Sequence, residues 1–327
     1  MSSVACRSRL AAAAASLWLG ACVTIHEGST PASRSGVGPA AVELAAVPFF
    51  PQEIHACGPA ALAELLVREG VDITPEVLSD EVYLPGREGT LAPELVASVR
   101  RHGLLPELLP ARSEAVLHAV AQGRPVLVLQ NLGLDMLPHW HYAVVVGYDL
   151  GRQEVLLRSG LERRQRMSLF TFEQTWLRGG GFALTAVRPD QLPLYATAAQ
   201  WLQTLTDAHA PAAAWERAAK HWPGSAAASF GLANARLARP QPDLHAAEQA
   251  LSDAIRDDPD FLPAYNNLAL VLARQNNWVE ARKAIEGGIA RIGVPPASPA
   301  AAALLPAFED TRRQVLAGRL DPPAGAR

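Results

Sequence analysis

One cysteine at the start of a predicted helix is the residue best placed for nucleophilic chemistry. Cys57 is followed at once by Gly58 and Pro59 in the stretch "HACGPAALAELLVREG". Proline is typical of a first helical turn, and the apolar residues after it repeat with helical spacing. The unpaired N–H groups and the positive dipole end of such a helix favour a thiolate. Placement alone leaves two interpretations open, a nucleophile and an inert buried thiol.

A thiolate nucleophile needs a base, and His141 is the best candidate among the nine histidines of the chain. It begins the β-rich run "HYAVVVGYD" (141–149), where a side chain can face the end of a helix packed across the sheet. A half-buried histidine without a catalytic role is the alternative. His55 and His139 remain as further candidates, because the other histidines lie in the N-terminal segment, on predicted helix surfaces or in the C-terminal half.

A metal site is a rival chemistry for the same residues. His55, Cys57, His139 and His141 could converge on zinc, and a His-x-His pair is a known ligand spacing. A Cys-Gly-Pro helix start has no need of a metal, however. The sequence also lacks a Gly-rich phosphate loop and a Gly-x-Ser-x-Gly elbow. We therefore expect neither a metal nor another cofactor.

The run "VPFFPQEIHACGPAALAELL" followed by "HYAVVVGYD" resembles the bacteriocin-processing, double-glycine type of papain-like cysteine peptidase, and more closely its stand-alone C39-like branch. The resemblance covers about residues 47–189. It implies that Cys57 is the nucleophile, His141 the base and Gln52 the amide donor of the oxyanion hole. An amide five residues before the nucleophile is within reach of that role. The implied activity is hydrolysis of a peptide or protein substrate through an acyl-enzyme.

The sequence departs from the family pattern at the residue that orients the imidazole. The family usually has Asp or Asn on the strand after the histidine strand, whereas this chain has Arg158 and Ser159 in "VLLRSG". Ser159 could accept weakly from the ring N–H, and Asn131 after "PVLVLQ" is an alternative from the neighbouring strand. A Cys–His dyad can function without a third residue because cysteine is already nucleophilic. This departure from the family pattern puts the catalytic strength of the site in question.

The elements that must position these residues are helices first and strands afterwards. Helical patterns are predicted in "CGPAALAELLVREG", "TPEVLSDEVY", "APELVASVRRHG" and "SEAVLHAVAQG", and strands at 125–130, 141–149, 154–159, 163–169 and 182–188. The connections between these strands are too short for crossover helices, so the sheet should be mostly antiparallel. We expect an α+β papain-like cysteine peptidase domain over residues 47–190, with its N-terminal helices on an antiparallel sheet.

The C-terminal half is rich in alanine and repeats itself. Leu232 corresponds to Leu268 at a spacing of 36 residues, and Ala247 to Ala281 at a spacing of 34. This period resembles tetratricopeptide repeats, whose helix pairs stack on one another; a generic helical-hairpin bundle is the alternative. We expect an all-α repeat domain at 194–292 that recruits a protein partner. A C-terminal helix and a disordered tail should follow at 293–327.

The N-terminus indicates export. Residues 1–21 have an early positive charge and a short apolar run, as in a signal peptide. The ending "LGAC" resembles the lipobox of bacterial lipoproteins, which implies lipidation of Cys22; a plain signal peptide cut nearby is the alternative. Residues 22–46 should be a flexible tether. The resemblance implies a membrane-anchored protein of the cell envelope, on the outer membrane facing the periplasm.

Cysteine count and charge narrow the function further. Of the three cysteines, Cys6 would leave with the signal and Cys22 would be lipidated, so we expect Cys57 to have no partner for an internal disulfide. The net charge is -3 without a basic stripe, which argues against a nucleic-acid partner. The leading hypothesis is a cysteine peptidase. The alternatives are a weak or inactive peptidase-like fold that binds peptides, and an acyl transferase or amidase acting on cell-wall peptide.

Overall fold

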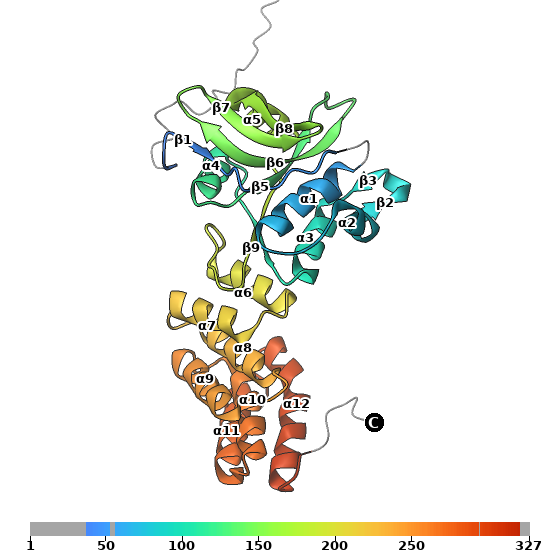
Figure 1. Cartoon of the computed structure of the whole chain (residues 1–327). Coiled ribbons are helices and arrows are strands. Elements are labelled where there is room, and N and C mark those ends of the chain that lie inside the picture. Colours follow the sequence, from blue (N-terminus) through green and yellow to red (C-terminus); the bar gives the residue numbers. More distant parts are fainter. Residues whose placement is uncertain (1–36, 53–55, 294, 321–327) are drawn as a thin grey trace, which may run out of the picture.

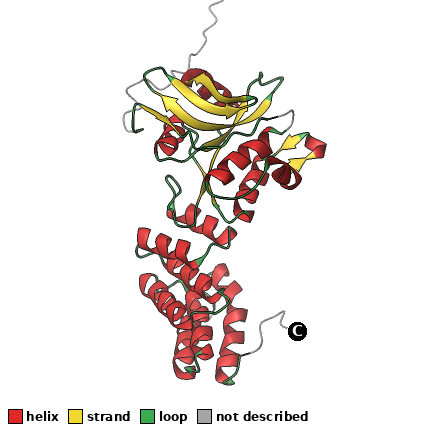
Figure 2. Cartoon of the chain, in the orientation of Figure 1, coloured by secondary structure: helices red, strands yellow, loops and turns green. Residues whose placement is uncertain are grey.

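The structure is a computed structural model that describes residues 37–52, 56–293 and 295–320. The predicted signal segment, the lipidation candidate Cys22 and the metal-ligand candidate His55 lie outside these residues. An α+β domain comes first along the chain and an all-helical region follows it (Figure 1). Figure 2 shows that every strand lies in the first part.

A seven-stranded sheet forms the centre of the α+β domain, and all of its strand pairs are antiparallel. The strand order is β4-β9-β5-β6-β7-β8, and β1 pairs with β6. The strands are β1 (Ala41–Glu43), β4 (Leu105–Leu108), β5 (Val126–Asn131), β6 (Trp140–Asp149), β7 (Glu154–Ser159), β8 (Glu162–Ser168) and β9 (Ala183–Val187).

Helices cover both faces of this sheet, because its buried strands alternate apolar side chains between two cores. The first core lies against α1 (Cys57–Arg68), α2 (Pro75–Val82) and α3 (Ala92–Arg101) and contains Tyr142, Val144 and Val146. The second lies against α4 (Ser113–Ala121) and α5 (Leu169–Arg178) and contains Ala143 and Val145. The alternation on β6 follows from the period of two along a strand.

A small hairpin adjoins the first core. It consists of β2 (Tyr83–Leu84), the 3-10 turn η2 (Pro85–Arg87) and β3 (Gly89–Thr90). β3 contacts α1 near its N-terminus: a Cβ at Gly58 would lie 2.6 Å from the Thr90 Cβ. The glycine after Cys57 therefore allows this hairpin to approach the helix start.

Several elements differ from the sequence-based expectations, among them the β2–β3 hairpin, where a helix end and a loop were expected. Ala41–Glu43 pairs with β6 and Val37 is buried, so these residues of the expected tether 22–46 belong to the folded domain. The segment is too short for an alternating pattern to reveal it. The strand β4 was not predicted, and α5 connects β8 to β9 although that connection was expected to lack a helix. β9 still pairs antiparallel because it inserts between β4 and β5.

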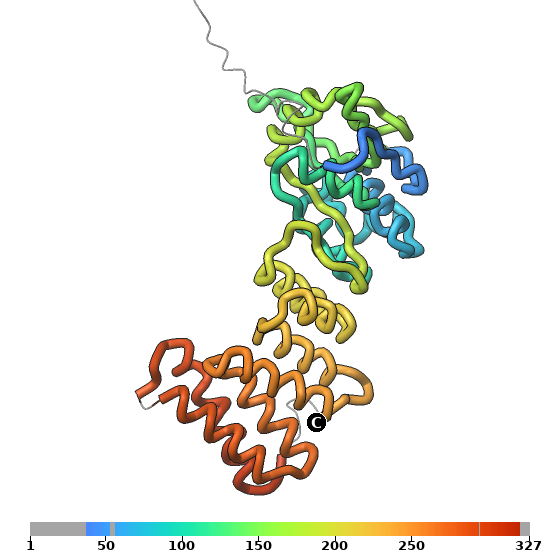
Figure 3. The backbone as a smooth tube through the Cα atoms, turned by 90° about the vertical axis from the view of Figure 1, so that its left-hand side faces the viewer, coloured from blue at the N-terminus to red at the C-terminus, as the bar shows by residue number. Residues whose placement is uncertain are grey.

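The C-terminal region contains seven helices among the described residues. They are α6 (Ala198–Asp207), α7 (Ala212–His221), α8 (Ala226–Leu237), α9 (Leu244–Asp257), α10 (Leu262–Arg274), α11 (Trp278–Ile292) and α12 (Pro299–Leu316). Each helix packs against the next one along the chain, as the tube in Figure 3 shows. This confirms an antiparallel α+β domain followed by an all-helical region.

The first helix of this region shares a core with the sheet. Trp201 and Leu205 of α6 lie in the same buried cluster as Leu105 of β4 and Val187 of β9. In the described part of the chain, no helix is long and apolar enough to cross a membrane.

Candidate active site

Cys57 is the first residue of α1 and is partly buried. Ala56 occupies the N-cap and has no side-chain acceptor for the helix N–H groups. The first N–H groups of a helix have no intrahelical partner, and Pro59 has no N–H, so those of Cys57 and Gly58 are available near the thiol. Two turns of apolar residues behind them pack into the first core and fix the helix against the sheet.

His141 lies on β6 and its Nε2 is 2.9 Å from the Ser159 hydroxyl on β7. In the tautomer in which Nε2 carries the proton, Nε2–H donates to Ser159 and Nδ1 keeps the lone pair that could accept a thiol proton. Burial, together with the positive charge of His139, lowers the pKa of His141 to about 4. The imidazole is therefore neutral near pH 7 and suited to act as a base.

Gln52 is 7% exposed and is held by Gly160 through two hydrogen bonds. Gly160 N–H donates to Gln52 Oε1 at 3.0 Å, and Gln52 N–H donates to the Gly160 carbonyl at 2.9 Å. Its Nε2 is buried and has no hydrogen-bond partner within the described residues. A buried N–H₂ without an acceptor is costly, and this amide is thus available to donate to an oxygen atom that enters the cleft.

Cys57, His141 and Gln52 all line one cleft of about 830 Å³. Its other walls come from the turn after β2, the start of α3 and the end of β5; they include Thr90, Leu91, Pro93, Leu129 and Trp140. Tyr142 also lines it and donates its hydroxyl to the Thr90 carbonyl at 3.2 Å. Burial and the charge of Cys57 raise the pKa of Tyr142 well above its usual range. Its hydroxyl therefore remains a donor.

The structure does not bring Asn131 to the imidazole. Its Oδ1 accepts from the N–H groups of Gly133 and His139, at 3.0 and 2.9 Å, and so closes the turn between β5 and β6. Asn131 is therefore not the orienting residue that the sequence offered as an alternative. Ser159 is the residue that the structure places on the ring.

One member of the metal alternative, His55, lies outside the described residues. Among the residues that the structure describes, no group of three or more His, Cys, Asp or Glu side chains could hold a metal ion. His139 lines the cleft beside His141.

Sequence reasoning missed Gly160, Thr90 and Glu64. Gly160 follows Ser159 directly, but only the fold shows that its backbone holds Gln52. Glu64 interrupts the apolar face of α1 seven residues after Cys57 and is fully buried. A charged residue within a buried stripe is the signal that could have identified it.

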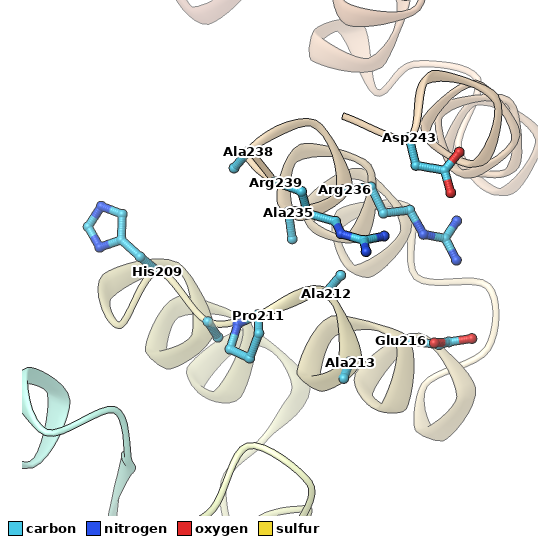
Figure 4. Close-up of a pocket in the computed structure, with 11 residues that line it drawn as sticks. His209, Pro211, Ala212, Ala213, Glu216, Ala235, Arg236, Ala238, Arg239 and Asp243 are labelled. Atoms are coloured by element: carbon cyan, nitrogen blue, oxygen red, sulfur yellow. The ribbon is translucent and has the colours of Figure 1, made fainter. Parts of the chain in front are cut away.

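A second hollow of about 590 Å³ lies between helices of the C-terminal region (Figure 4). Its lining includes His209, Glu216, Arg236, Arg239 and Asp243, from α7, α8 and the turns beside them. No cysteine lines it.

Comparison with known proteins agrees with the division of the chain into two regions. Residues 44–183 match the model of the Peptidase_C39 like family. The matched residues all lie in the α+β domain, and the helical region lies outside the match. No curated protein matched the chain.

Solved structures similar to the chain include a C39-like peptidase from Bacillus anthracis, with 20% identity over 46% of this chain and 98% of that one, and a TM-score of 0.40. A double glycine motif protease from an AMS/PCAT transporter, in complex with the leader peptide, has 17% sequence identity to this chain and a TM-score of 0.34. The match covers 46% of this chain and 93% of that protease. The peptidase domain of Streptococcus ComA, a bi-functional ABC transporter, has 19% sequence identity to this chain and a TM-score of 0.35. The match covers 43% of this chain and 98% of that domain.

Proposed function

We propose that this C39-like domain is a cysteine-type peptidase in which Cys57 is the nucleophile and His141 the base. The observation that carries the proposal is that both line one cleft with Gln52, whose buried Nε2 lacks a partner among the described residues. A thiol nucleophile needs a base and a donor for the oxyanion beside it. The imidazole of His141, hydrogen-bonded to Ser159, would be the base, and the amide of Gln52 would be the donor.

The reaction follows from these positions. His141 takes the thiol proton of Cys57, and the thiolate attacks the carbonyl carbon of the scissile peptide bond. Gln52 Nε2–H and the backbone N–H at the start of α1 stabilise the resulting oxyanion. The imidazolium then protonates the leaving amine, which leaves a thioester on Cys57. A water molecule, deprotonated by His141, hydrolyses the thioester and restores the thiol.

The connection between β5 and β6 reaches the cleft through His139 and the adjoining Trp140 and includes a hydrogen-bonded turn that exposes apolar side chains. Leu134 and Leu137 form a bridge between β5 and β6 through N–H···O bonds of 3.2 and 3.1 Å. Their side chains, and those of Met136 and Trp140, are exposed. Exposed apolar side chains on an ordered turn are typical of an interaction surface.

Peptide hydrolysis with labelling of the thiol tests the proposal. Iodoacetamide should modify Cys57 faster in the folded protein than in urea, and His141→Ala should remove this excess. Cys57→Ala should abolish cleavage of a peptide library, whereas His245→Ala, an exposed histidine of α9, should leave cleavage unchanged. Equal labelling rates in folded and unfolded chains would contradict the proposal.

A binding protein without turnover is the second candidate. Arg158 and Ser159 stand where the resemblance implies a carboxylate or amide, and this departure favours it. Capture of peptides by wild-type chain that cleaves none of them would support this candidate. Acyl transfer would differ from hydrolysis in its products, which mass spectrometry distinguishes.

Partner and location are part of the same proposal. The helical region would act as tetratricopeptide-like repeats that recruit a protein, and Cys22 would carry the lipid that anchors the chain to the outer membrane.

Crosslinking in cells tests the partner. The Cys57→Ala variant should still be crosslinked to the partner protein. If the partner binds in the hollow of Figure 4, adding Arg236→Ala and Arg239→Ala should weaken this crosslinking. Cys22→Ser should move the protein from the membrane fraction to the soluble fraction.

A further inference from the structure

Two buried polar residues, Glu64 and Arg158, hold the segment that leads to Gln52. Phe50 N–H donates to Glu64 Oε1 at 3.1 Å, and Arg158 Nη2 donates to the Val47 carbonyl at 3.2 Å. Glu64 is on α1, two turns after Cys57, and is fully buried. Arg158 is on β7 and is 2% exposed.

These two residues are an unusual choice for stability alone. Burial raises the pKa of Glu64 to about 8, although the Phe50 N–H bond and the charge of Arg158 act in the opposite direction. Glu64 Oε2 and Arg158 Nε have no hydrogen-bond partner in the described part of the chain. Buried polar atoms without hydrogen-bond partners lower stability, so apolar residues would serve a purely stabilising role better. What the pair does provide is a fixed position for residues 47–50.

The same residues join the three parts of the proposed site. Gln52 lies two residues after Phe50, and Gly160, which holds the Gln52 amide, lies two residues after Arg158. Arg158 also donates to the carbonyl of Arg163 on β8, which fixes it at the β7–β8 end of the sheet. Residues 47–50 are therefore hydrogen-bonded to two elements of the site. Glu64 links them to the helix that carries Cys57, and Arg158 links them to the strand that carries Ser159.

We propose that Glu64 and Arg158 are positioning residues that hold the Gln52 amide in place relative to Cys57 while the oxyanion forms. They act through Gln52 and touch no reacting atom. This inference rests on the proposed peptidase function and adds two residues that determine its rate.

A double-mutant cycle tests it. Gln52→Ala should lower kcat by about 10²–10³-fold, the usual effect of one lost oxyanion donor. Glu64→Leu should lower kcat at least tenfold with little change in KM, because the loss is confined to the transition state. In the Gln52→Ala background, Glu64→Leu should change kcat less than twofold, since it has no donor left to misplace. Glu64→Gln keeps an acceptor for Phe50 N–H and should retain most activity.

Alkylation of Cys57 by iodoacetamide separates this inference from the proposed function, because alkylation forms no oxyanion. Its rate should be unchanged in Glu64→Leu. Additive losses of kcat in the cycle, or an equal loss of alkylation and turnover in Glu64→Leu, would overturn the positioning role. Arg158→Met and Arg158→Lys provide the same comparison if Glu64→Leu does not fold. If iodoacetamide modified Cys57 of the wild type no faster in the folded protein than in urea, that result would instead contradict the role of Cys57 as the nucleophile.

Discussion

At the residue scale, the environment of His141 determines when a base is available. Its pKa lies below the ordinary histidine value because burial disfavours the charged ring and His139 repels it. The nearby Ser159 hydroxyl carries no charge with which to offset these effects. The chain thus differs from a site in which a carboxylate stabilises the imidazolium.

The pH profile of kcat/KM should reflect this pKa. A group with a lowered pKa loses its proton at lower pH, so the acid limb should lie well below 6.5, toward about 4, as pH is varied from 3.5 to 8. His139→Gln removes the like charge and should move the limb to higher pH. An acid limb at or above 6.5 in the wild type would contradict a neutral imidazole in the free protein.

Removing the Ser159 hydroxyl should weaken turnover without removing it. A hydrogen bond of this kind contributes about 0.5–1.5 kcal/mol, so Ser159→Ala should lower kcat by roughly two- to tenfold. Steady-state kinetics measure the change, with thermal melting as a control for folding. A loss as large as that of His141→Ala would show that Ser159 does more than orient the ring.

At the element scale, close helix packing in the C-terminal region depends on particular glycines. In α11, Gly287 and Gly288 are adjacent but face different surroundings. A Cβ at Gly288 would lie 2.4 Å from the Phe308 ring and 2.8 Å from the Tyr265 Cβ, whereas one at Gly287 would lie no closer than 3.7 Å to any neighbour. Gly288 therefore sets how near α12 and α10 approach α11.

This pair gives a matched test of the packing. Gly288→Ala should destabilise the protein by about 1–3 kcal/mol through overpacking. Gly287→Ala should stabilise it by about 0.5–1 kcal/mol through helix propensity. Urea denaturation followed by circular dichroism measures both. Equal effects of the two substitutions would contradict the observed helix contacts.

At the scale of the whole molecule, one buried carboxylate fastens the helical region to the sheet. Glu107 on β4 is 2% exposed, and its Oε1 accepts from the backbone N–H groups of residues 194–196 at 2.7–3.2 Å. Its Oε2 accepts from Arg124 at 3.2 Å, and Arg124 also donates to the Leu192 carbonyl at 2.7 Å. The chain between the two parts is thus a bound strap, next to the core that α6 shares with the sheet.

Removing this carboxylate should release the strap. Glu107→Ala leaves the Arg124 guanidinium without its carboxylate partner and three backbone N–H groups without an acceptor. This should cost about 3–5 kcal/mol and make residues 192–196 sensitive to proteolysis. Asp190→Ala breaks an ion pair whose aspartate is 63% exposed and should cost about 0–1 kcal/mol. Protection of residues 192–196 in Glu107→Ala equal to that in the wild type would contradict the strap.

The local sequence determined the helix start at Cys57, the strand at His141 and the order of the two regions. These features follow from proline and glycine placement, from apolar periodicity and from the period of the C-terminal helices, all of which are encoded over a few neighbouring residues. The short strand β1 and the helix α5 escaped prediction because their assignment depends on what they pair with or cover.

Only the tertiary structure decided which side chains meet. The sequence left both Ser159 and Asn131 as possible hydrogen-bond partners of the His141 ring. The register of β6 with β5 and β7 brings Ser159 to the ring. Gly160 holds Gln52 across 108 positions of sequence, and Glu64 reaches Phe50 across 14. Such contacts depend on strand order and helix orientation in three dimensions. Residue spacing along the chain does not contain that information.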